Sequence, residues 1–488
     1  MKRYITLMLA SALVLSAVSC GSDSKGNDET TTSDAGTTAA DETTAPEETD
    51  GLPEKDMDGF ELKINHFDGT WLSWALTTLD VESETGDRLD DAIYRRNRDM
   101  EDRFNCKISV TGQETIWNKD IQAEVMAGDN NYDVWFMYDI DIMGAIEYLM
   151  PWEELPYIKL GEEWWNPMAT EVFELGGKTY AAAGNYSLSA LSRASGFAFN
   201  KTVFEQTNPG EDVYALAKDG KWTIDKMTEF AKNAYSDLNG NSTIDDEDRF
   251  GLSGSWKETF SRLLLGSGIE YISKDKDDLP VFSLPTDENA ISKILHVYDL
   301  FSDEQVYRNT GKAMDTNGDG LGSSEFKGGK LLFYVANMFD LEQMRDFDIE
   351  MGFLPCPKYD EAQEHYYAPS FGSEISTLLK TLPQDRMENV GILLEALAYD
   401  TNKSIIPEYK EVLLKTKYAR DNESEDMIDI VIDSVSFEFG LNAWQDTVAN
   451  PLVKNIFVAR NPSVASTLAK MQTSVDTQIE KLVEKLEQ

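Results

Sequence analysis

The sequence predicts an α/β fold in which helices pack against sheets of parallel strands. Residues 60–64 alternate between apolar and polar side chains, which is the period of a half-buried strand. Residues 132–137 (YDVWFM) form a nearly continuous apolar run, as in a parallel strand buried on both faces. Residues 87–104 between them form a helical stretch, and strands separated by helices are typical of layered α/β folds.

The later segments repeat this alternation. Residues 107–110 are expected to form a short strand, and residues 331–335 another apolar strand. Thr223 is a candidate N-cap for the helix that follows it, because its hydroxyl can accept a backbone N–H of the first turn. Pro383 stands in the first turn of a further helix with one apolar face. The last helix, about 462–488, carries a single apolar stripe, which favours docking on its own domain over a coiled-coil partner.

The composition bounds the class of protein and its partners. The chain has 488 residues, of which 41% are hydrophobic, so it can bury a sizeable core in two or three domains. Lys and Arg number 44 against 88 Asp and Glu, which gives a formal net charge of −44. Binding to nucleic acid or to an anionic membrane surface needs clustered Lys and Arg. We therefore expect no nucleic-acid partner and no direct membrane binding by the folded part.

The N-terminus predicts export and a lipid anchor. Lys2 and Arg3 precede an apolar run from Ile5 to Val18, which is shorter than the about 20 residues of a membrane-spanning helix. Residues 1–19 therefore read as a signal peptide. The small residues directly before Cys20 resemble a bacterial lipobox, so Cys20 is predicted to become the lipidated N-terminus at the extracellular face of the cell membrane. An ordinary signal peptide with an incidental cysteine is the alternative.

The segment after Cys20 is predicted to be a tether. Residues 21–56 contain no aromatic residue and a single large aliphatic one, Leu52. Such a segment buries too little apolar surface to offset the conformational entropy lost on ordering. Residues 20–56 are therefore expected to hold a folded body, beginning near Met57, away from the membrane.

Two further cysteines follow, Cys106 and Cys356. Their spacing does not require a disulfide. The sequence favours two unpaired residues that behave as small hydrophobic side chains, with a single disulfide as the alternative.

One acidic loop has the spacing of an EF-hand calcium loop. Oxygen donors recur at the calcium-loop positions between residues 237 and 248, although Ser242 replaces the usual turn glycine and the last acid is Asp rather than Glu. Structural calcium and a plain Asn/Gly-rich turn both remain open. The candidate ligands are Asp237, Asn239, Asn241, Thr243, Asp245 and Asp248. A second candidate, residues 315–320, lacks an acid at its twelfth position, and a turn is favoured there.

No motif in the sequence indicates catalysis. The chain has no G-x-S-x-G, P-loop, H-E-x-x-H or paired C-x-x-C motif, and its three histidines are scattered along the sequence. A site assembled in space from distant residues stays open, but no residue pattern points to one. We therefore expect no enzyme activity and no required cofactor.

Aromatic and amide residues recur just after the predicted strands. Trp71 and Trp74 follow the first strand, Tyr138 and Asp139 follow the YDVWFM strand, and later strands lead to Trp256, Tyr334 and Asn337. In α/β folds the carboxyl ends of strands face the ligand crevice. Sugars are bound there by aromatic faces and by polar side chains that hydrogen-bond hydroxyls. Core packing is the alternative for each ring taken singly, but the recurrence favours a binding site.

The order of several motifs resembles family 1 extracellular solute-binding proteins of ABC importers, the group that includes maltose-binding-type proteins. The similarity extends from about residue 57 onward. Gly176–Tyr180 followed by Ala198–Lys201 is similar to the family's crossing between lobes, and Lys221–Thr223 to its W-T segment. Phe326–Phe333 and Phe347–Lys358 are similar to the family's F-x-x-G-K and F-D-I-G segments.

The resemblance implies a two-lobe fold of the periplasmic-binding-protein type (type II), with a hinge between lobes. Lobe 1 would comprise residues 57–185 and a return segment 368–430. Lobe 2 would comprise residues 186–367 and C-terminal helices 431–488. Ligand would be enclosed as the lobes close. The implied ligand-binding residues are Asp68, Trp71, Tyr138, Asp139, Asn185, Tyr186, Trp256, Tyr334, Asn337 and Phe371.

We expect a monomeric, lipid-anchored protein. The resemblance implies that it captures a mono- or oligosaccharide and delivers it to the permease subunits of an ABC importer. A binder of a non-sugar solute such as a peptide or polyol is one alternative. A surface glycan-binding or sensing lipoprotein without transport is another.

Overall fold

The computed structural model describes residues 49–308, 322–344, 347–414 and 422–487. The predicted signal peptide 1–19, the lipidation residue Cys20, residues 20–48 of the tether and the loop 315–320 lie outside the described residues. The described residues from Asp50 onward belong to one compact unit. Asp50 is buried and its Oδ2 lies 2.5 Å from Nη1 of Arg103. The folded unit thus includes the end of the segment predicted as a tether.

The first sheet has five strands in the order β2-β1-β3-β14-β6. The first three strands are parallel, and β14 pairs antiparallel with both β3 and β6. A strand from late in the sequence is therefore inserted into a sheet formed by the N-terminal part. The strands are β1 (Phe60–Phe67), β2 (Cys106–Gln113), β3 (Val134–Tyr138), β6 (Ala181–Ala182) and β14 (Glu374–Thr377).

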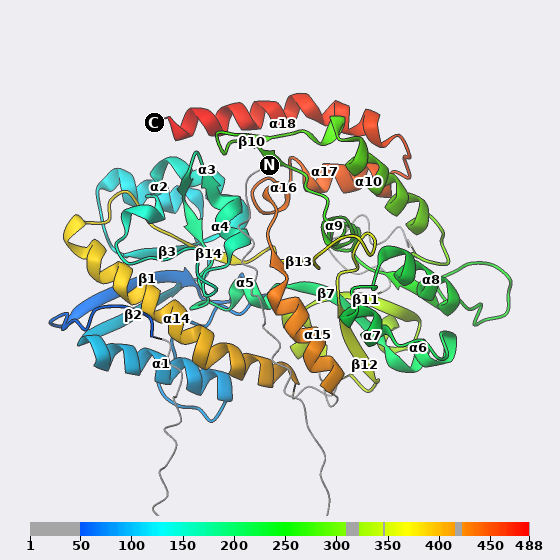
Figure 1. Cartoon of the computed structure of the whole chain (residues 1–488), viewed down its shortest axis with the longest axis horizontal. Helices are drawn as coiled ribbons and strands as arrows, with labels where there is room; N and C mark the ends of the chain where they lie inside the picture. Colours follow the sequence, from blue (N-terminus) through cyan, green and yellow to red (C-terminus); the bar gives the residue numbers. More distant parts are fainter. Residues whose placement is uncertain (1–48, 309–321, 345–346, 415–421, 488) are drawn as a thin grey trace, which may run out of the picture. The chain divides into compact units, whose positions relative to one another are not determined.

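Two long helices, α1 (Arg88–Phe104) and α14 (Gln384–Leu414), lie side by side next to this sheet (Figure 1). Helix α1 begins where the Asp87 side chain accepts the N–H groups of Leu89 and Asp90. It ends at Asn105, whose φ of 45° is left-handed. The helix predicted over 87–104 is thereby confirmed.

The second sheet has four strands in the order β12-β7-β11-β8. Strand β7 is antiparallel to both of its neighbours, whereas β8 is parallel to β11. Next to it, α8 (Ile224–Ala234) begins where Thr223 Oγ1 accepts the Lys226 N–H at 3.3 Å, so the N-cap prediction is confirmed. The strands are β7 (Ser195–Asn200), β8 (Phe250–Ser253), β11 (Leu331–Asn337) and β12 (Met351–Pro355).

The chain passes between the two sheets more than once. It runs from β6 to β7, and it returns from β12 to β14. On the return, β13 (Ala368–Pro369) pairs in parallel with β15 (Val435–Ser436), so two connecting segments lie side by side. The chain therefore contributes strands first to one sheet, then to the other, and then to the first sheet again.

The C-terminal helix α18 (Val464–Leu486) packs on other elements of the same unit, as its apolar stripe predicts. It contacts α10 (Glu288–Phe301) and the short turn η4 (Leu284–Thr286) (Figure 1). Near its end, Lys485 Nζ donates to the Gly144 carbonyl at 2.6 Å and lies 3.3 Å from Glu147 Oε1. Within the described ranges, no helix combines the length and hydropathy that crossing a membrane requires.

Candidate ligand site

Four aromatic rings meet near the carboxyl ends of β1, β2 and β3. The centroid of Trp71 lies 5.2 Å from Trp74, 5.0 Å from Trp117 and 5.1 Å from Tyr138, each edge to face. The turn after β1 places the two tryptophans, because Asp68 Oδ1 accepts the Thr70 N–H at 2.8 Å. We call these four rings the Trp71 cluster. All four are partly exposed, so they are available to a ligand.

The connecting segment at Phe371 joins this cluster. Trp74 Nε1 donates to the Gly372 carbonyl at 2.9 Å. Arg193 Nε donates to the Phe371 carbonyl at 3.0 Å and Nη1 to the Trp74 carbonyl at 3.2 Å. Gly372 has a φ of 75°, and a Cβ there would lie 3.3 Å from Trp74 Nε1 and 3.4 Å from the Tyr138 hydroxyl. The close approach of backbone and rings therefore requires glycine.

Two arginines flank the Phe371 ring, with guanidinium carbons 5.7 Å (Arg193) and 4.7 Å (Arg262) from its centroid. The Arg262 side chain is 1% exposed, and its three nitrogens have no hydrogen-bond partner among the described residues. Its ion-pair contact is Glu258, with Nη2 and Oε2 3.4 Å apart. A buried guanidinium without hydrogen bonds is costly, so the N–H groups of Arg262, which are closed to solvent here, would be stabilised by an acceptor that reaches them.

Asp139 connects three segments rather than pointing at solvent. It is fully buried, and its Oδ2 accepts the Gly372 N–H at 2.8 Å and Asn442 Nδ2 at 2.9 Å. Its Oδ1 accepts the Ile140 N–H at 2.9 Å. Burial raises the pKa of Asp139 to about 7, although these hydrogen bonds favour the charged form. The structure thus places this predicted ligand residue behind the rings, with both oxygens engaged.

The second-sheet residues lie at the neighbouring strand ends. Asn337 is buried, and it exchanges hydrogen bonds with Asp340 at the start of α13 (Met338–Met344), both 3.0 Å long. Burial raises the pKa of Asp340, and the charges of Arg193 and Arg262 oppose this. Asn337 therefore positions an acid near both arginines.

Trp256 and Tyr334 lie beside other aromatic residues of their own half. Trp256 begins α9 (Trp256–Gly266), which also carries Arg262, and it is 7% exposed beside a cavity of about 20 Å³ that Phe260 also lines. Tyr334 stacks on Phe326 with centroids 5.6 Å apart.

Asn185 and Tyr186 lie elsewhere. Asn185 Nδ2 donates to Asn402 Oδ1 of α14 at 2.9 Å. The Tyr186 ring is buried, 5.9 Å from Phe136 and 5.8 Å from Trp165, in the apolar core next to the first sheet. Of the predicted residues, the structure therefore brings together Asp68, Trp71, Tyr138, Asp139 and Phe371, and it does not bring Asn185 or Tyr186 to them.

Sequence reasoning missed Trp117, Arg193, Glu258 and Arg262. One signal could have found the arginines, because each interrupts a run of small or apolar residues: Arg193 in SALSRASG and Arg262 in TFSRLLLG. A charged residue in such a run must be paired, hydrogen-bonded or functional when the run is buried.

The acidic loop partly fits a calcium site. Ser242 takes the left-handed conformation, with a φ of 60°, at the position where the calcium loop has glycine. Asp248 is fully buried, and its Oδ1 has no hydrogen-bond partner among the described residues. Other donors bond within the loop: Asn241 Nδ2 donates to Asp245 Oδ2 at 2.7 Å. Among the described residues, no group of three or more His, Cys, Asp or Glu side chains is arranged to hold a metal ion.

Comparison with known proteins identifies the fold. No family model and no curated protein matches the chain. Solved structures do. A cyclic alpha-maltosyl-1,6-maltose binding protein from Arthrobacter globiformis is 13% identical, with a TM-score of 0.56 over 87% of this chain and 100% of that one.

The ABC substrate-binding protein Lmo0181 from Listeria monocytogenes, in complex with cycloalternan, is 12% identical, with a TM-score of 0.51 over 87% of this chain and 100% of that one. A family 1 extracellular solute-binding protein from Bifidobacterium longum subsp. infantis is 10% identical, with a TM-score of 0.51 over 86% of this chain and 99% of that one. The predicted two-lobe α/β fold of periplasmic binding proteins is thereby confirmed.

Proposed function

We propose that the chain is an extracellular binding protein that captures a carbohydrate between its two halves for ABC-type import, without chemical turnover. The fold supports a binding protein, because the solved structures that share it are described as binding proteins. One of them is described as a cyclic alpha-maltosyl-1,6-maltose binding protein, and another as a complex with cycloalternan. The sequence also lacks a catalytic motif.

The observation that carries the proposal is the Trp71 cluster beside Phe371 and the two arginines. Partly exposed rings at strand ends offer faces for the C–H patches of a sugar. The N–H groups of Arg262 have no acceptor among the described residues, and hydroxyl or carboxylate oxygens of a ligand that reaches them can accept their hydrogen bonds. The connecting segment at Phe371 thus lies between rings from the first sheet and an arginine from a helix beside the second sheet. A ligand enclosed between two halves would contact side chains from both in this way.

A glycan-binding screen by calorimetry tests the proposal. We expect one class of mono- or oligosaccharide to bind without being degraded, and Trp71→Ala to weaken that binding at least about tenfold. Tyr157→Ala is the matched control, since Tyr157 is an aromatic residue that is 41% exposed and lies outside the cluster. Cleavage of a bound glycan, or equal affinity of wild type and Trp71→Ala, would contradict the proposal.

Lipid anchoring at Cys20 belongs to the same proposal. A lipid on Cys20 would hold the binding protein at the outer face of the membrane, next to the permease subunits. Cys20→Ser is expected to abolish incorporation of a labelled fatty acid and to release the protein into the medium. Retention of Cys20→Ser in the membrane fraction would argue for a plain signal peptide with another mode of attachment.

We also propose that the loop of Asp237 binds a structural calcium ion. The left-handed Ser242 and the unpartnered oxygen of buried Asp248 support this. The ion would be held by the six donors named from the sequence, after the internal hydrogen bonds of the loop give way. No reacting group is assigned to the ion.

A further inference from the structure

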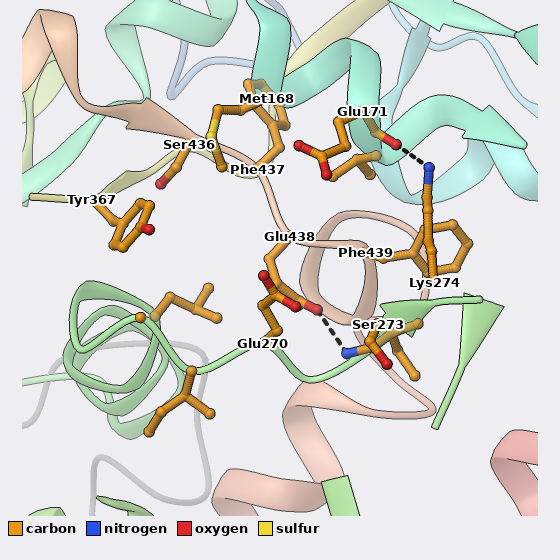
Figure 2. Close-up of a pocket in the computed structure, with 15 residues that line it drawn as sticks. Met168, Glu171, Glu270, Ser273, Lys274, Tyr367, Ser436, Phe437, Glu438 and Phe439 are labelled. Atoms are coloured by element: carbon orange, nitrogen blue, oxygen red, sulfur yellow. Dashed lines mark hydrogen bonds between the residues drawn. The ribbon is translucent and has the colours of Figure 1, made fainter. Parts of the chain in front are cut away.

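A second cavity lies between elements of the two halves, away from the Trp71 cluster. It has a volume of about 150 Å³ and is lined by α4 (Pro167–Phe173), by residues from the segment 265–274, by Tyr367 and by residues 436–439 (Figure 2). A cavity of about this volume admits a molecule the size of benzene. It is therefore too small for an oligosaccharide.

The wall of this cavity is apolar and aromatic. Met168 and Val172 come from α4, and Ile269 comes from the segment that follows α9. Phe437, Phe439 and Tyr367 add three aromatic side chains to the lining. Aromatic faces attract organic cations as well as apolar groups, because the face of the ring is electron-rich.

The one ammonium group at the cavity is already engaged within the described residues. Lys274 Nζ donates to the carbonyls of Glu171 and Glu174, and it lies 3.1 Å from Asp278 Oδ1. Its charge is therefore largely balanced by Asp278, outside the cavity lining.

Three carboxylates line the same cavity, and two of them have no hydrogen-bond or ion-pair partner among the described residues. Glu438 accepts the N–H groups of Tyr271 at 3.1 Å, Ile272 at 3.0 Å and Leu441 at 2.9 Å. The carboxylates of Glu171 and Glu270, in contrast, have no hydrogen-bond or ion-pair partner among the described residues, and both residues are exposed at the rim. Two acids without counter-ions thus face an aromatic hollow.

The pKa shifts of Glu270 and Tyr367 are consistent with a negative electrostatic potential at the cavity. Desolvation by the surrounding wall, followed by the charges of Glu171 and Asp287, raises the pKa of Glu270. Burial, and then the charges of Glu270 and Glu171, raise the pKa of the Tyr367 hydroxyl. A bound cation would relieve this repulsion.

We propose that this cavity binds a small organic cation with about six to eight non-hydrogen atoms, of the quaternary ammonium type. The charged head would lie against Tyr367 and the carboxylates of Glu171 and Glu270, and the apolar methyl groups against Phe437 and Ile269. The site is separate from the proposed sugar site, because the two share no residue.

Such an occupant would also connect the halves of the molecule. Glu171 belongs to α4, which follows the first sheet in the sequence, whereas Glu270 follows α9 beside the second sheet. Neutralising both acids at once therefore favours the arrangement in which they lie close together. The cation would stabilise that arrangement by mass action.

Calorimetry on the full chain with choline as the probe tests this proposal. We expect choline to bind and to raise the melting temperature, and its neutral isostere 3,3-dimethyl-1-butanol to bind at least about tenfold more weakly. Glu171→Gln and Glu270→Gln should each weaken choline binding several-fold, and the double variant should abolish it. Glu205→Gln, at an exposed acid outside the cavity lining, should leave choline binding unchanged.

Three results would overturn the proposal: no choline binding at millimolar concentrations, equal binding of the neutral isostere, or wild-type choline affinity in the double variant. The glycan screen on the same preparation is read separately. Loss of sugar binding in Trp71→Ala with choline binding retained would show that the two sites are independent. Absence of sugar binding in the wild type would remove the proposed function and leave the cation site standing.

Discussion

Asp139 and Asn442 are joined by a 2.9 Å hydrogen bond between Oδ2 and Nδ2, although 303 positions separate them in the sequence. Asn442 Nδ2 also donates to the Ser370 carbonyl at 2.8 Å. One side-chain amide thus links the end of β3, the connecting segment before Phe371, and α16 (Phe439–Asn442). The geometry of the Trp71 cluster depends on this link, because Gly372 donates to the same Asp139 oxygen.

Asn442→Ala is expected to lower the free energy of unfolding by about 2 kcal/mol, since it leaves a buried Asp139 oxygen and the Ser370 carbonyl short of a donor. Urea denaturation measures this change. Asn450→Ala is the control, because the Asn450 amide donates to the exposed Asp446 carboxylate at 2.8 Å and should cost little. Equal losses of unfolding free energy in the two variants would show that the buried hydrogen bonds of Asn442 stabilise the protein no more than the exposed one of Asn450.

Stability is expected to fall as pH rises from about 4 to about 7. Burial raises the pKa of Asp139 from 3.8, and that of Glu438 from 4.5, to about 7 in the folded protein. The folded state therefore keeps protons that the unfolded chain has already released, and this stabilisation is lost as pH rises through about 7. Melting temperatures across this range should show a shallower decline in Asp139→Asn than in the wild type. Parallel curves would refute the assignment to Asp139.

Arg262→Met is expected to leave the free energy of unfolding unchanged or higher, because it removes a buried guanidinium that has no hydrogen bond among the described residues, and its ion-pair partner Glu258 is 40% exposed and can be hydrated instead. It should nevertheless weaken sugar binding about tenfold or more. Arg386→Met provides the contrast: Arg386 forms two bonds, 2.6 and 2.7 Å long, to buried Asp133. That variant should cost about 3 kcal/mol. A large stability loss in Arg262→Met would assign Arg262 to the scaffold instead.

Gly372→Ala is expected to destabilise the protein more than Gly59→Ala. Both glycines are left-handed, with φ values of 75° and 76°, so both variants cost about 1–2 kcal/mol of backbone strain. An added Cβ has no neighbour within 4 Å at Gly59, whereas at Gly372 it meets Trp74 and Tyr138. The difference between their unfolding midpoints measures crowding alone. Tryptophan fluorescence should shift only in Gly372→Ala.

Calcium at saturating concentration is expected to raise the melting temperature of the wild type. At about a hundred times the dissociation constant, the gain in free energy of unfolding is about 2.7 kcal/mol. Asp237→Ala should abolish the rise, whereas Asp219→Ala, an exposed acid outside the loop, should retain it. A wild-type melting temperature that does not respond to calcium would contradict the calcium site and favour a plain turn at residues 237–248.

Local sequence patterns predicted the elements well. The alternation at Phe60 and the N-cap at Thr223 are encoded within a few neighbouring residues, and both were recovered in the structure. The family resemblance implied that residues 368–430 return to lobe 1, but the position of β14 between β3 and β6 was not predicted, because strand pairing between residues about two hundred positions apart leaves no trace in periodicity.

The candidate site was predicted only in part, because local patterns place a residue at a strand end but do not show which residues cover it. Trp71 and Tyr138 follow strands, so their positions at one sheet edge follow from topology. Tyr186 is also polar-tipped and aromatic, yet it packs between Phe136 and Trp165. Which rings are covered depends on the neighbours that the whole fold supplies, and single-sequence patterns do not contain this information.

The two contacts of Lys485 limit how the halves can rotate. Helix α18 packs on η4 and α10, and Lys485 near its C-terminus is attached to Gly144 and Glu147 beside the first sheet. A continuous helix resists bending, so rotation of one half about an axis far from Lys485 would have to rupture its ion pair. Motions with an axis near this end would preserve it. The C-terminal helix thereby favours motions that pivot close to its own terminus.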